Sequence, residues 1–310
     1  MIANNPHQSA RTRLNPYRLK LTLMALPFFI LVVLFNYVPI AGWVLAFFDY
    51  FPGVIFSKME FVGLKYFKLI FFFWDDVQNA LVNTLFFSAM GILLSPLPAI
   101  FAIQLTEIRA LKLKKLIQTT VTLPNFISWV IVYSLIGSIF SFDGAINRIL
   151  VNLGYEITAT TTLLGNKNLS WYFMTFLGIW KSLGWSSIIY LAALAGIDRE
   201  LYEAAEIDGA NRWRSTLHIT VPGLMPTFFV LFLLQIGSFL SVGFEQYFVF
   251  ANSLTRQKLE VIDLFVYRIG INSQDYSFAT AIGILRSLIS IALMFSMNSL
   301  SKHIRGESII

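Results

Sequence analysis

The sequence contains no cysteine, which excludes disulfide bridges and thiolate metal sites from this chain. Charged residues are also scarce: they make up 13% of the chain, whereas a soluble domain carries about a quarter. Apolar residues take their place, at 56% of the sequence and with a mean hydropathy of +0.68. A soluble protein of this composition would expose far too much apolar surface, so we expect most of the chain to lie in lipid.

Motifs for catalysis and nucleotide binding are missing as well. The histidines, His7, His218 and His303, are far apart and form no metal-binding spacing such as His-Glu-x-x-His. The sequence also has no Gly-x-x-x-x-Gly-Lys-Ser/Thr loop, the Walker A site that holds a nucleotide. We therefore expect this chain to have no catalytic residue, no metal ion and no bound cofactor of its own.

Six apolar stretches are each long enough to cross a bilayer, which takes about 20 residues. They predict an all-α membrane protein with a single transmembrane domain over residues 21–301, between tails at 1–20 and 302–310. The first stretch is too long for the core of a cleaved signal peptide, and we interpret it as a retained helix. The predicted spans are 21–45, 79–105, 116–142, 170–196, 222–245 and 277–300.

Lysine and arginine are concentrated on one side of this predicted topology. That side holds both tails and the loops after the second and fourth spans, so the positive-inside rule predicts that both termini are cytoplasmic. The same distribution explains the net charge of +6 without a nucleic-acid partner. The basic residues on this side are Arg11, Arg13, Arg18, Lys20, Arg109, Lys112, Lys114, Lys115, Arg199, Arg212, Arg214, Lys302 and Arg305.

The last of the outer loops has apolar residues at helical spacing. Leu259, Ile262, Val266 and Ile269 recur three or four positions apart, which places them on one face of a helix. We therefore predict a short amphipathic helix that lies on the membrane surface or on a partner.

The loop after the fourth span has the pattern of two short helices joined by a sharp turn. Asp198 can cap the first helix, and Gly209 can end it because glycine readily adopts the left-handed conformation. Asn211 can then cap the second helix. Ala204 and Ala205 give the first helix a face of small residues, which suits a groove on another protein. We predict a compact docking element over residues 198–222.

This loop resembles the signature of ABC importer permeases, which reads Glu-Ala-Ala, three residues, Gly, nine residues, Ile, one residue, Leu, Pro. Val221 in place of leucine is the only departure from it. The resemblance implies the type I ABC importer permease fold, with six transmembrane helices and this loop as a cytoplasmic coupling helix that docks on an ATP-hydrolysing subunit. It assigns that coupling to Glu203, Ala204, Ala205, Asp208, Gly209, Arg212, Ile219 and Pro222.

Other segments resemble the branch of these permeases that takes up sugars, in particular oligosaccharides and polysaccharide fragments. They are residues 123–132, residues 276–287 and the Gly-Glu-Ser motif that ends at Ser308. The resemblance implies a multi-pass protein of the bacterial inner membrane that works by alternating access. As partners it implies membrane lipid, a second homologous permease, two ABC ATPase subunits that bind ATP and magnesium, and an extracytoplasmic solute-binding protein.

Polar and aromatic residues inside the spans are candidates for the substrate pathway, because a polar group in lipid is costly and needs a reason. Tryptophan can stack on the apolar face of a sugar, amides can bind its hydroxyls, and a cation can meet an acidic sugar. The same groups also join helices in membrane bundles, and the sequence does not separate the two interpretations. The candidates are Asn125, Trp129, Trp180, Lys181, Trp185, Glu245, Gln246 and Arg286.

Two other classes of membrane protein fit the sequence less well. An ion-coupled secondary transporter of a polar solute would use Lys181, Glu245 and Arg286 for coupling, but it gives no reason for the Glu-Ala-Ala loop and would be expected to show inverted repeats. An intramembrane enzyme would need paired carboxylates or a metal cluster at membrane depth, and the spans contain neither.

Overall fold

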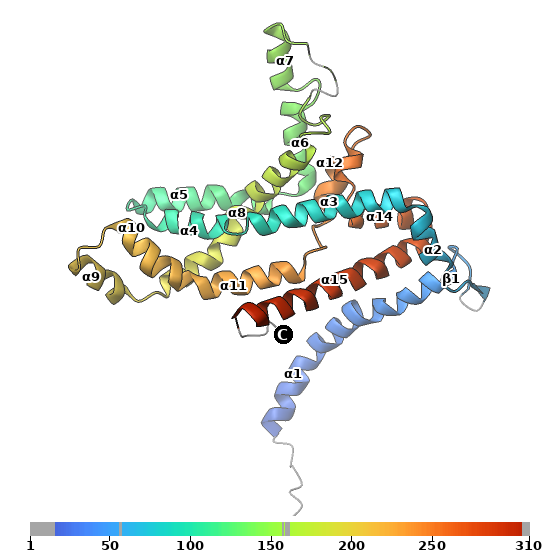
Figure 1. Ribbon diagram of the computed structural model, residues 1–310, viewed down its shortest axis with the longest axis horizontal. Coiled ribbons are helices and arrows are strands. Elements are labelled where there is room, and N and C mark those ends of the chain that lie inside the picture. Colours follow the sequence, from blue (N-terminus) through green and yellow to red (C-terminus); the bar gives the residue numbers. More distant parts are fainter. Residues whose placement is uncertain (1–15, 56–57, 157, 159–161, 306–310) are drawn as a thin grey trace, which may run out of the picture.

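The computed structural model describes residues 16–55, 58–156, 158 and 162–305, which form a mostly helical protein (Figure 1). Six of its segments are long and apolar enough to cross a membrane, which confirms the predicted fold class. Apolar sequence becomes helical in lipid because a helix satisfies its backbone hydrogen bonds internally. The six segments are Lys20–Phe47, Trp74–Thr106, Trp129–Asn152, Ser170–Ala195, Arg212–Gly237 and Tyr276–Ser296.

The secondary structure subdivides these segments and adds short elements between them. The elements are α1 (Pro16–Val32), η1 (Val33–Tyr37), η2 (Val38–Phe47), β1 (Phe48–Asp49), β2 (Glu60–Phe61), α2 (Lys65–Phe72), α3 (Trp74–Leu93), α4 (Leu97–Thr106), α5 (Leu111–Thr122), η4 (Leu123–Phe126), α6 (Trp129–Phe140), α7 (Ala145–Asn152), α8 (Ser170–Ala195), α9 (Arg199–Ile207), α10 (Arg212–Ser215), η5 (Thr216–Thr220), α11 (Val221–Gly237), α12 (Glu245–Phe250), α13 (Arg256–Leu259), α14 (Ile262–Tyr267), η6 (Arg268–Asn272) and α15 (Tyr276–Arg305).

The two ends of the chain differ in detail from the predicted tails. α1 begins at Pro16 and α15 continues to Arg305, so helix extends into both segments that were predicted as tails. Arg11, Arg13 and Ser308, which carried part of the topology and of the resemblance, lie outside the described residues.

The first apolar segment stands apart from the other helices. α1 diverges from the rest of the molecule in Figure 1, and its apolar stretch has no buried residue. The chain then changes helix type through η1 and η2, where Pro39 cannot donate an α-helical hydrogen bond. Only η2 packs closely on the body of the protein, against α15. The exposed side chains of α1 therefore need an apolar environment, such as lipid or another membrane helix.

The centre of the molecule is built from α3, α8, α11 and α15. α3 gives way to α4 at a turn over residues 94–96, because Pro96 and Pro98 cannot continue an α-helical ladder. α4 and α5 pack against α8. The contact with α5 requires Gly184, since a Cβ atom there would lie 2.4 Å from the backbone oxygen of Val121.

The prediction of one uninterrupted third span over residues 116–142 has to be corrected. The helix breaks between η4 and α6, where Ile127 and Ser128 have extended backbone conformations. Pro124 lies in η4 and removes a backbone donor just before the break. The Ser128 hydroxyl then caps α6 by accepting a hydrogen bond from the Ile131 amide at 3.4 Å. Beyond the break, α6 and α7 leave the central bundle (Figure 1).

The fifth predicted span, 222–245, is also interrupted. α11 ends at Gly237, and the chain continues without regular helix from Ser238 to Phe244 before α12 begins at Glu245. Gly243, with a φ angle of +93°, supports this irregular path because only glycine adopts such a conformation cheaply. We call residues 238–244 the linker.

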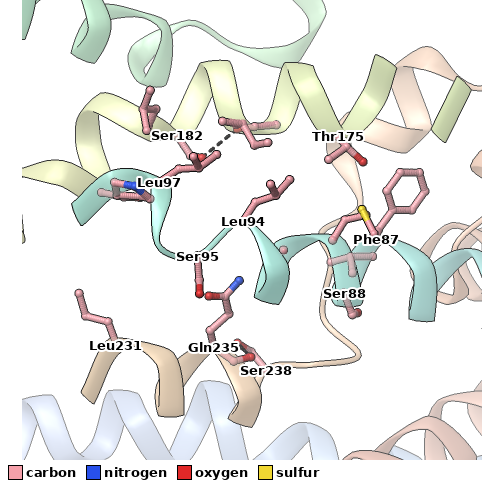
Figure 2. Close-up of a pocket in the computed structure, with 18 of the residues that line it drawn as sticks. Phe87, Ser88, Leu94, Ser95, Leu97, Thr175, Ser182, Leu231, Gln235 and Ser238 are labelled. Carbon is pink, nitrogen blue, oxygen red and sulfur yellow. Dashed lines mark hydrogen bonds between the residues drawn. The ribbon is translucent and has the colours of Figure 1, made fainter. Parts of the chain in front are cut away.

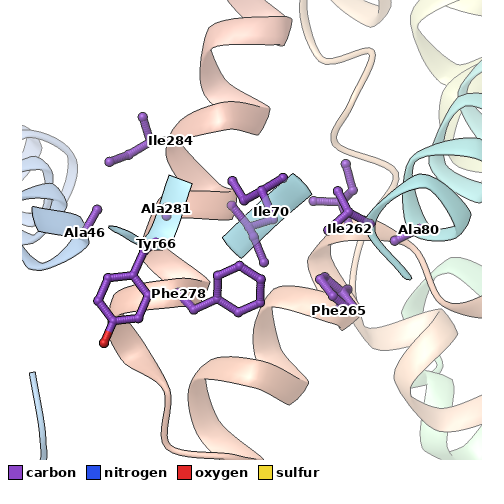
Figure 3. Packing of buried hydrophobic residues seen from close by; sticks show 11 residues of the cluster. Ala46, Tyr66, Ile70, Ala80, Ile262, Phe265, Phe278, Ala281 and Ile284 are labelled. Atoms are coloured by element: carbon purple, nitrogen blue, oxygen red, sulfur yellow. The ribbon is translucent and has the colours of Figure 1, made fainter. Parts of the chain in front are cut away.

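The amphipathic helix predicted near residues 259–269 exists, but its predicted surface position is wrong. α14 is buried against α3 and α15, and Ile262 and Phe265 are 2% and 1% exposed. Figure 3 shows both side chains in one apolar cluster with Ile70 of α2 and Ala281 of α15. The apolar spacing therefore indicated contact with the protein's own helices.

A small polar cluster lies beside the short β1–β2 pair, just after the first apolar segment. Asp49 accepts hydrogen bonds from the Lys65 ammonium at 2.9 Å and from the Tyr66 hydroxyl at 2.6 Å. These two hydrogen bonds, that of Lys65 first, lower the pKa of the Asp49 carboxyl below its usual value. The cluster fixes the end of the first segment to α2.

Candidate functional site

The loop over residues 198–222 folds as two short helices around a sharp turn, as its sequence predicted. Asp198 caps α9 by accepting a hydrogen bond from the Glu200 amide at 3.0 Å. Gly209 ends that helix with a φ angle of +73°, and the Ala210 amide closes the turn on the Ala205 carbonyl at 2.8 Å. Asn211 then caps α10 through a hydrogen bond from the Arg214 amide at 2.9 Å.

The surface of this loop is both charged and apolar. Glu203, Ala204, Asp208 and Arg212 are exposed, while Ala205 and Ile219 are partly buried. Two large apolar side chains project beside them: Ile207 is 87% exposed and Trp213 is 68% exposed. Ile207 lies outside the six apolar segments and Trp213 lies at the first turn of the fifth, so an exposed apolar pair at this place is typical of a contact surface for another protein.

The loop is attached to the membrane helices at several points. The hydroxyls of Tyr202 in α9 and Thr220, just before α11, are 2.9 Å apart. Arg212 lies 3.7 Å from the carboxylate of Glu107, which follows α4. Pro222, in the first turn of α11, follows directly. A force on the loop would therefore reach both α4 and α11.

Three of the predicted pathway residues meet at the break between η4 and α6. Lys181 of α8 donates hydrogen bonds to the backbone oxygens of Pro124 and Asn125, at 3.2 and 2.9 Å. Its ammonium also lies 5.4 Å from the centre of the Trp129 ring, a cation–π distance. The Pro124 carbonyl also accepts a hydrogen bond from the Ile127 amide at 3.2 Å, so the lysine adds a second donor there and supplies a donor to the Asn125 carbonyl at the break. Lys181, Asn125 and Trp129 thus form a structural contact at the bend.

Arg286, another predicted pathway residue, is also bound to protein groups. Its guanidinium forms an ion pair with Asp263 of α14 at 2.5 Å. It also donates hydrogen bonds to the Leu240 carbonyl at 3.2 Å and to the Ser241 hydroxyl at 2.8 Å, both in the linker. These contacts place Arg286 behind the linker and tie it to α14.

A cavity of about 550 Å³ lies between α3, α8, α11 and the linker. Its lining mixes apolar and polar side chains and carries no charged side chain among the residues that the structure describes. Figure 2 shows Ser95, at the turn after α3, and Gln235 of α11 pointing toward each other in this cavity. The polar side chains that line it are Ser88, Ser95, Thr175, Ser182, Ser186, Tyr190, Gln235, Ser238, Ser241, Gln246 and Tyr247.

The Ser95 hydroxyl is the most informative group in the cavity. It is buried, yet it has no hydrogen-bond partner among the described parts of the chain. An unpaired buried hydroxyl costs about 1–3 kcal/mol. The Gln235 amide packs against α3 at Gly91, one helical turn before Ser95, where an added Cβ atom would lie 3.1 Å from its nitrogen.

Only two of the predicted pathway residues line this cavity. Trp185 is half exposed and packs edge-on against Phe126 at 5.6 Å. Gln246 donates a hydrogen bond to the Met174 carbonyl at 2.8 Å. Trp180 and Glu245 lie outside the lining, Glu245 exposed at the first turn of α12.

Three polar residues of the lining, Ser95, Gln235 and Ser238, were not among the predicted pathway residues. Sequence signals exist for Gln235 and Ser95. Gln235 carries a side-chain amide near the end of a long apolar helix, where a polar group is costly unless it is paired with another polar group or faces a cavity. Ser95 lies directly before Pro96, where a helix break at membrane depth must face protein or a cavity.

No group of three or more potential metal ligands occurs in the described part of the chain.

The protein family and the relatives that this chain resembles belong to the same class of membrane transport proteins. Residues 96–306 match the family described as binding-protein-dependent transport system inner membrane component. LplB of Bacillus subtilis (strain 168) is 39% identical over 93% of this chain and 90% of its own length. YteP of the same organism, a polygalacturonan/rhamnogalacturonan transport system permease protein, is 38% identical over 93% of this chain and 89% of its own length.

Solved structures give the same fold. A chain of a bacterial ABC transporter involved in the import of the acidic polysaccharide alginate superposes with a TM-score of 0.82 at 32% identity, covering 94% of this chain and 97% of its own. In the complex of that type of transporter with an alginate pentasaccharide-bound periplasmic protein, the TM-score is 0.81 at 31% identity, with coverage of 95% and 98%. This chain therefore belongs to the binding-protein-dependent transport system inner membrane components, and it is a multi-pass permease subunit of an ABC importer rather than an enzyme.

Proposed function

We propose that this permease carries a saccharide, an oligosaccharide or a polysaccharide fragment, that a solute-binding protein delivers to the outer end of the membrane pathway. The observation that carries the proposal is the cavity between α3, α8 and α11, whose lining combines neutral polar side chains with apolar ones. Two of the relatives, YteP and the alginate transporter, are described as transporters of polysaccharides, which supports a saccharide cargo here.

The chemistry of the cavity suits sugar hydroxyls. Its volume of about 550 Å³ lies within the range of small-molecule sites, about 300–1,000 Å³. Serine, threonine and glutamine side chains can both donate and accept hydrogen bonds, as hydroxyls require. Phe87, Trp185 and Tyr247 add aromatic surface on which the apolar face of a sugar ring can pack. Since no cation lines the cavity in the described residues, this subunit would bind hydroxyls rather than carboxylates.

The driving force would come from separate ATPase subunits. We place the loop over residues 198–222 on the cytoplasmic side, together with both termini, as the distribution of lysine and arginine predicts. Its exposed Ile207 and Trp213 would enter a groove on an ATPase subunit, with Glu203, Asp208 and Arg212 at the rim. ATP and magnesium would be held by those partners, and a second, homologous permease would complete the pathway.

Transmission from the loop to the cavity follows from its attachments. Tyr202 joins α9 to Thr220 at the start of α11, and α11 contributes Gln235 and Ser238 to the cavity. A shift of the loop on ATP binding would therefore move one wall of the cavity relative to α8, which is the basis for alternating access. Ion coupling finds no support here, since Lys181 and Arg286 are both engaged with protein groups.

The cargo site can be tested with the reconstituted complex of permeases, ATPases and binding protein. Gln235→Leu removes an amide from the cavity while keeping a similar volume, and should raise the KM for saccharide-stimulated ATP hydrolysis by about three- to tenfold. Gln104→Leu is the matched control, because Gln104 lies exposed on α4 outside the cavity lining and should leave KM unchanged. Equal KM values for Gln235→Leu and the control would refute the assigned site.

A further inference from the structure

The linker, residues 238–244, forms one wall of the cavity although it has no regular secondary structure. Ser238, Phe239, Ser241 and Val242 all line the cavity. Within the linker the backbone makes few hydrogen bonds of its own, such as Ser241 amide to Ser238 carbonyl at 2.8 Å. A segment of this kind does not keep its shape by a helical ladder, so contacts from other elements must hold it.

Two side chains from neighbouring helices supply such contacts. Ser88 of α3 hydrogen-bonds to the Phe239 carbonyl from the cavity side. From the other side, Arg286 of α15 binds the next two residues of the linker, the Leu240 carbonyl through Nε at 3.2 Å and the Ser241 hydroxyl through Nη2 at 2.8 Å.

Asp263 fixes the orientation of the Arg286 guanidinium. Its carboxylate lies 2.5 Å from Nη1, which leaves Nε and Nη2 directed at the linker. Both side chains are largely enclosed, with 26% of Arg286 and 18% of Asp263 exposed. Because a guanidinium is planar and presents its donors in a rigid fork, one arginine can bind three acceptors on two segments at once. A lysine ammonium cannot reproduce that geometry.

We propose that Arg286, oriented by Asp263, is a positioning residue that holds the linker as a fixed wall of the cavity and so sets the shape of the cargo site. Arg286 itself is not among the residues that line the cavity, so it acts through Leu240 and Ser241. Its effect on transport depends on the cavity being the cargo site, as proposed above. Its effect on the linker does not.

A neighbouring ion pair provides a matched control. Arg268 of η6 binds Glu260 at 2.6 Å, and Glu260 is 6% exposed. This pair lies near α14 as well, and it has the same chemistry, but Arg268 and Glu260 do not line the cavity. Arg268→Gln therefore tests the loss of an arginine–carboxylate contact near α14, with Glu260 still 3.5 Å from Arg256, whereas loss of the linker contacts requires a change at Arg286.

The linker's mobility can be measured directly, because the sequence contains no cysteine. Val242→Cys places one thiol in the cavity wall, and its rate of reaction with a small thiol reagent is measured in the assembled importer. Arg286→Lys keeps a cation beside Asp263 but loses the fork, and should raise the labelling rate about tenfold, as expected for the loss of a hydrogen bond to a charged group. Arg286→Gln should raise it at least as much, and Arg268→Gln should leave it unchanged.

Transport kinetics provide the second measurement. Arg286→Lys should raise the KM for saccharide-stimulated ATP hydrolysis, with basal hydrolysis unchanged. A wild-type labelling rate in both Arg286 variants, or an equal increase in Arg268→Gln, would overturn the proposal. Faster labelling with an unchanged KM would uphold the positioning of the linker and instead refute the cavity as the cargo site. Should Arg286→Gln fail to assemble, Asp263→Asn takes its place, with the same expected increase in labelling.

Discussion

The turn at Gly209 allows the docking role of the loop to be tested through backbone conformation alone. Gly209 has a φ angle of +73°, and a Cβ atom built there would have no neighbour within 4 Å. A substitution at this position therefore causes no steric clash with the surroundings, and its cost is the cost of the left-handed conformation. Side chains that differ in that cost should affect transport in a graded order.

The expected magnitudes follow from this conformational preference. Alanine in the left-handed region costs about 1 kcal/mol, while β-branched valine is expected to cost about 2 kcal/mol. Asparagine adopts that region more readily than other residues and should cost a few tenths. Differences of one and two kcal/mol correspond to about five- and thirtyfold in the population of the native turn. We therefore expect uptake per ATP hydrolysed to fall in the order Gly209→Asn, Gly209→Ala, Gly209→Val.

The assay is saccharide uptake and ATP hydrolysis measured together in proteoliposomes that contain the assembled importer. Binding of the ATPase subunits to each variant, measured in detergent, shows whether a lower coupling ratio reflects weaker docking. If Gly209→Val transports as efficiently as the wild type, the left-handed turn is not needed for coupling. If Gly209→Asn is as impaired as Gly209→Val, the effect does not arise from backbone conformation, and the reasoning is refuted.

Three further predictions concern stability, and each is measured by thermal unfolding in detergent. Lys181→Met should destabilise the protein by about 1–3 kcal/mol, because it removes the side-chain donor to the Asn125 carbonyl and leaves the Pro124 carbonyl with the Ile127 amide alone; an unchanged unfolding temperature would show that the Asn125 carbonyl finds another partner. Gly184→Ala should cost at least as much, since its Cβ would lie 2.4 Å from the Val121 oxygen, whereas Gly137→Ala, with no atom within 4 Å of the added Cβ, serves as its control. At pH values above the ordinary Asp pKa of 3.8, the contacts of Asp49 should contribute fully to the stability of the protein. This contribution should be lost as the pH falls through the pKa of Asp49 in the folded protein, which is lower than 3.8. Asp49→Asn should remove that part of the acid dependence, and an identical acid profile would contradict the assigned contacts.

The sequence predicted those features of the fold that depend on local chemistry. Six apolar stretches gave six helical segments, because helix formation in lipid requires only apolar residues in sufficient number. In the loop, Asp198, Gly209 and Asn211 have the predicted roles, since caps and left-handed turns involve residues only a few positions apart.

The interruptions of the helices could not be predicted in the same way. Apolar composition continues across Ile127 and across Leu240, so hydropathy does not mark the breaks there. What stabilises each break comes from a distant part of the chain: Lys181 reaches carbonyls 57 and 56 positions away, and Arg286 reaches Leu240 46 positions away. For the same reason, the sequence did not show whether these cations bind cargo or protein.

The polar groups of the membrane helices can therefore be divided by what satisfies them. Lys181 donates hydrogen bonds to the carbonyls at the break after η4, and Ser88 and Arg286 donate to the linker. The two cations, Lys181 and Arg286, therefore have few hydrogen-bond donors left for cargo. The turn between α3 and α4 differs, because its Ser95 hydroxyl is buried without a partner in the described residues and faces Gln235 across the cavity. Irregular backbone at membrane depth is stable only where it is buried or faces a polar cavity. Cargo recognition in this chain is thus expected from its neutral hydroxyl and amide groups, with the charged residues holding the walls in place.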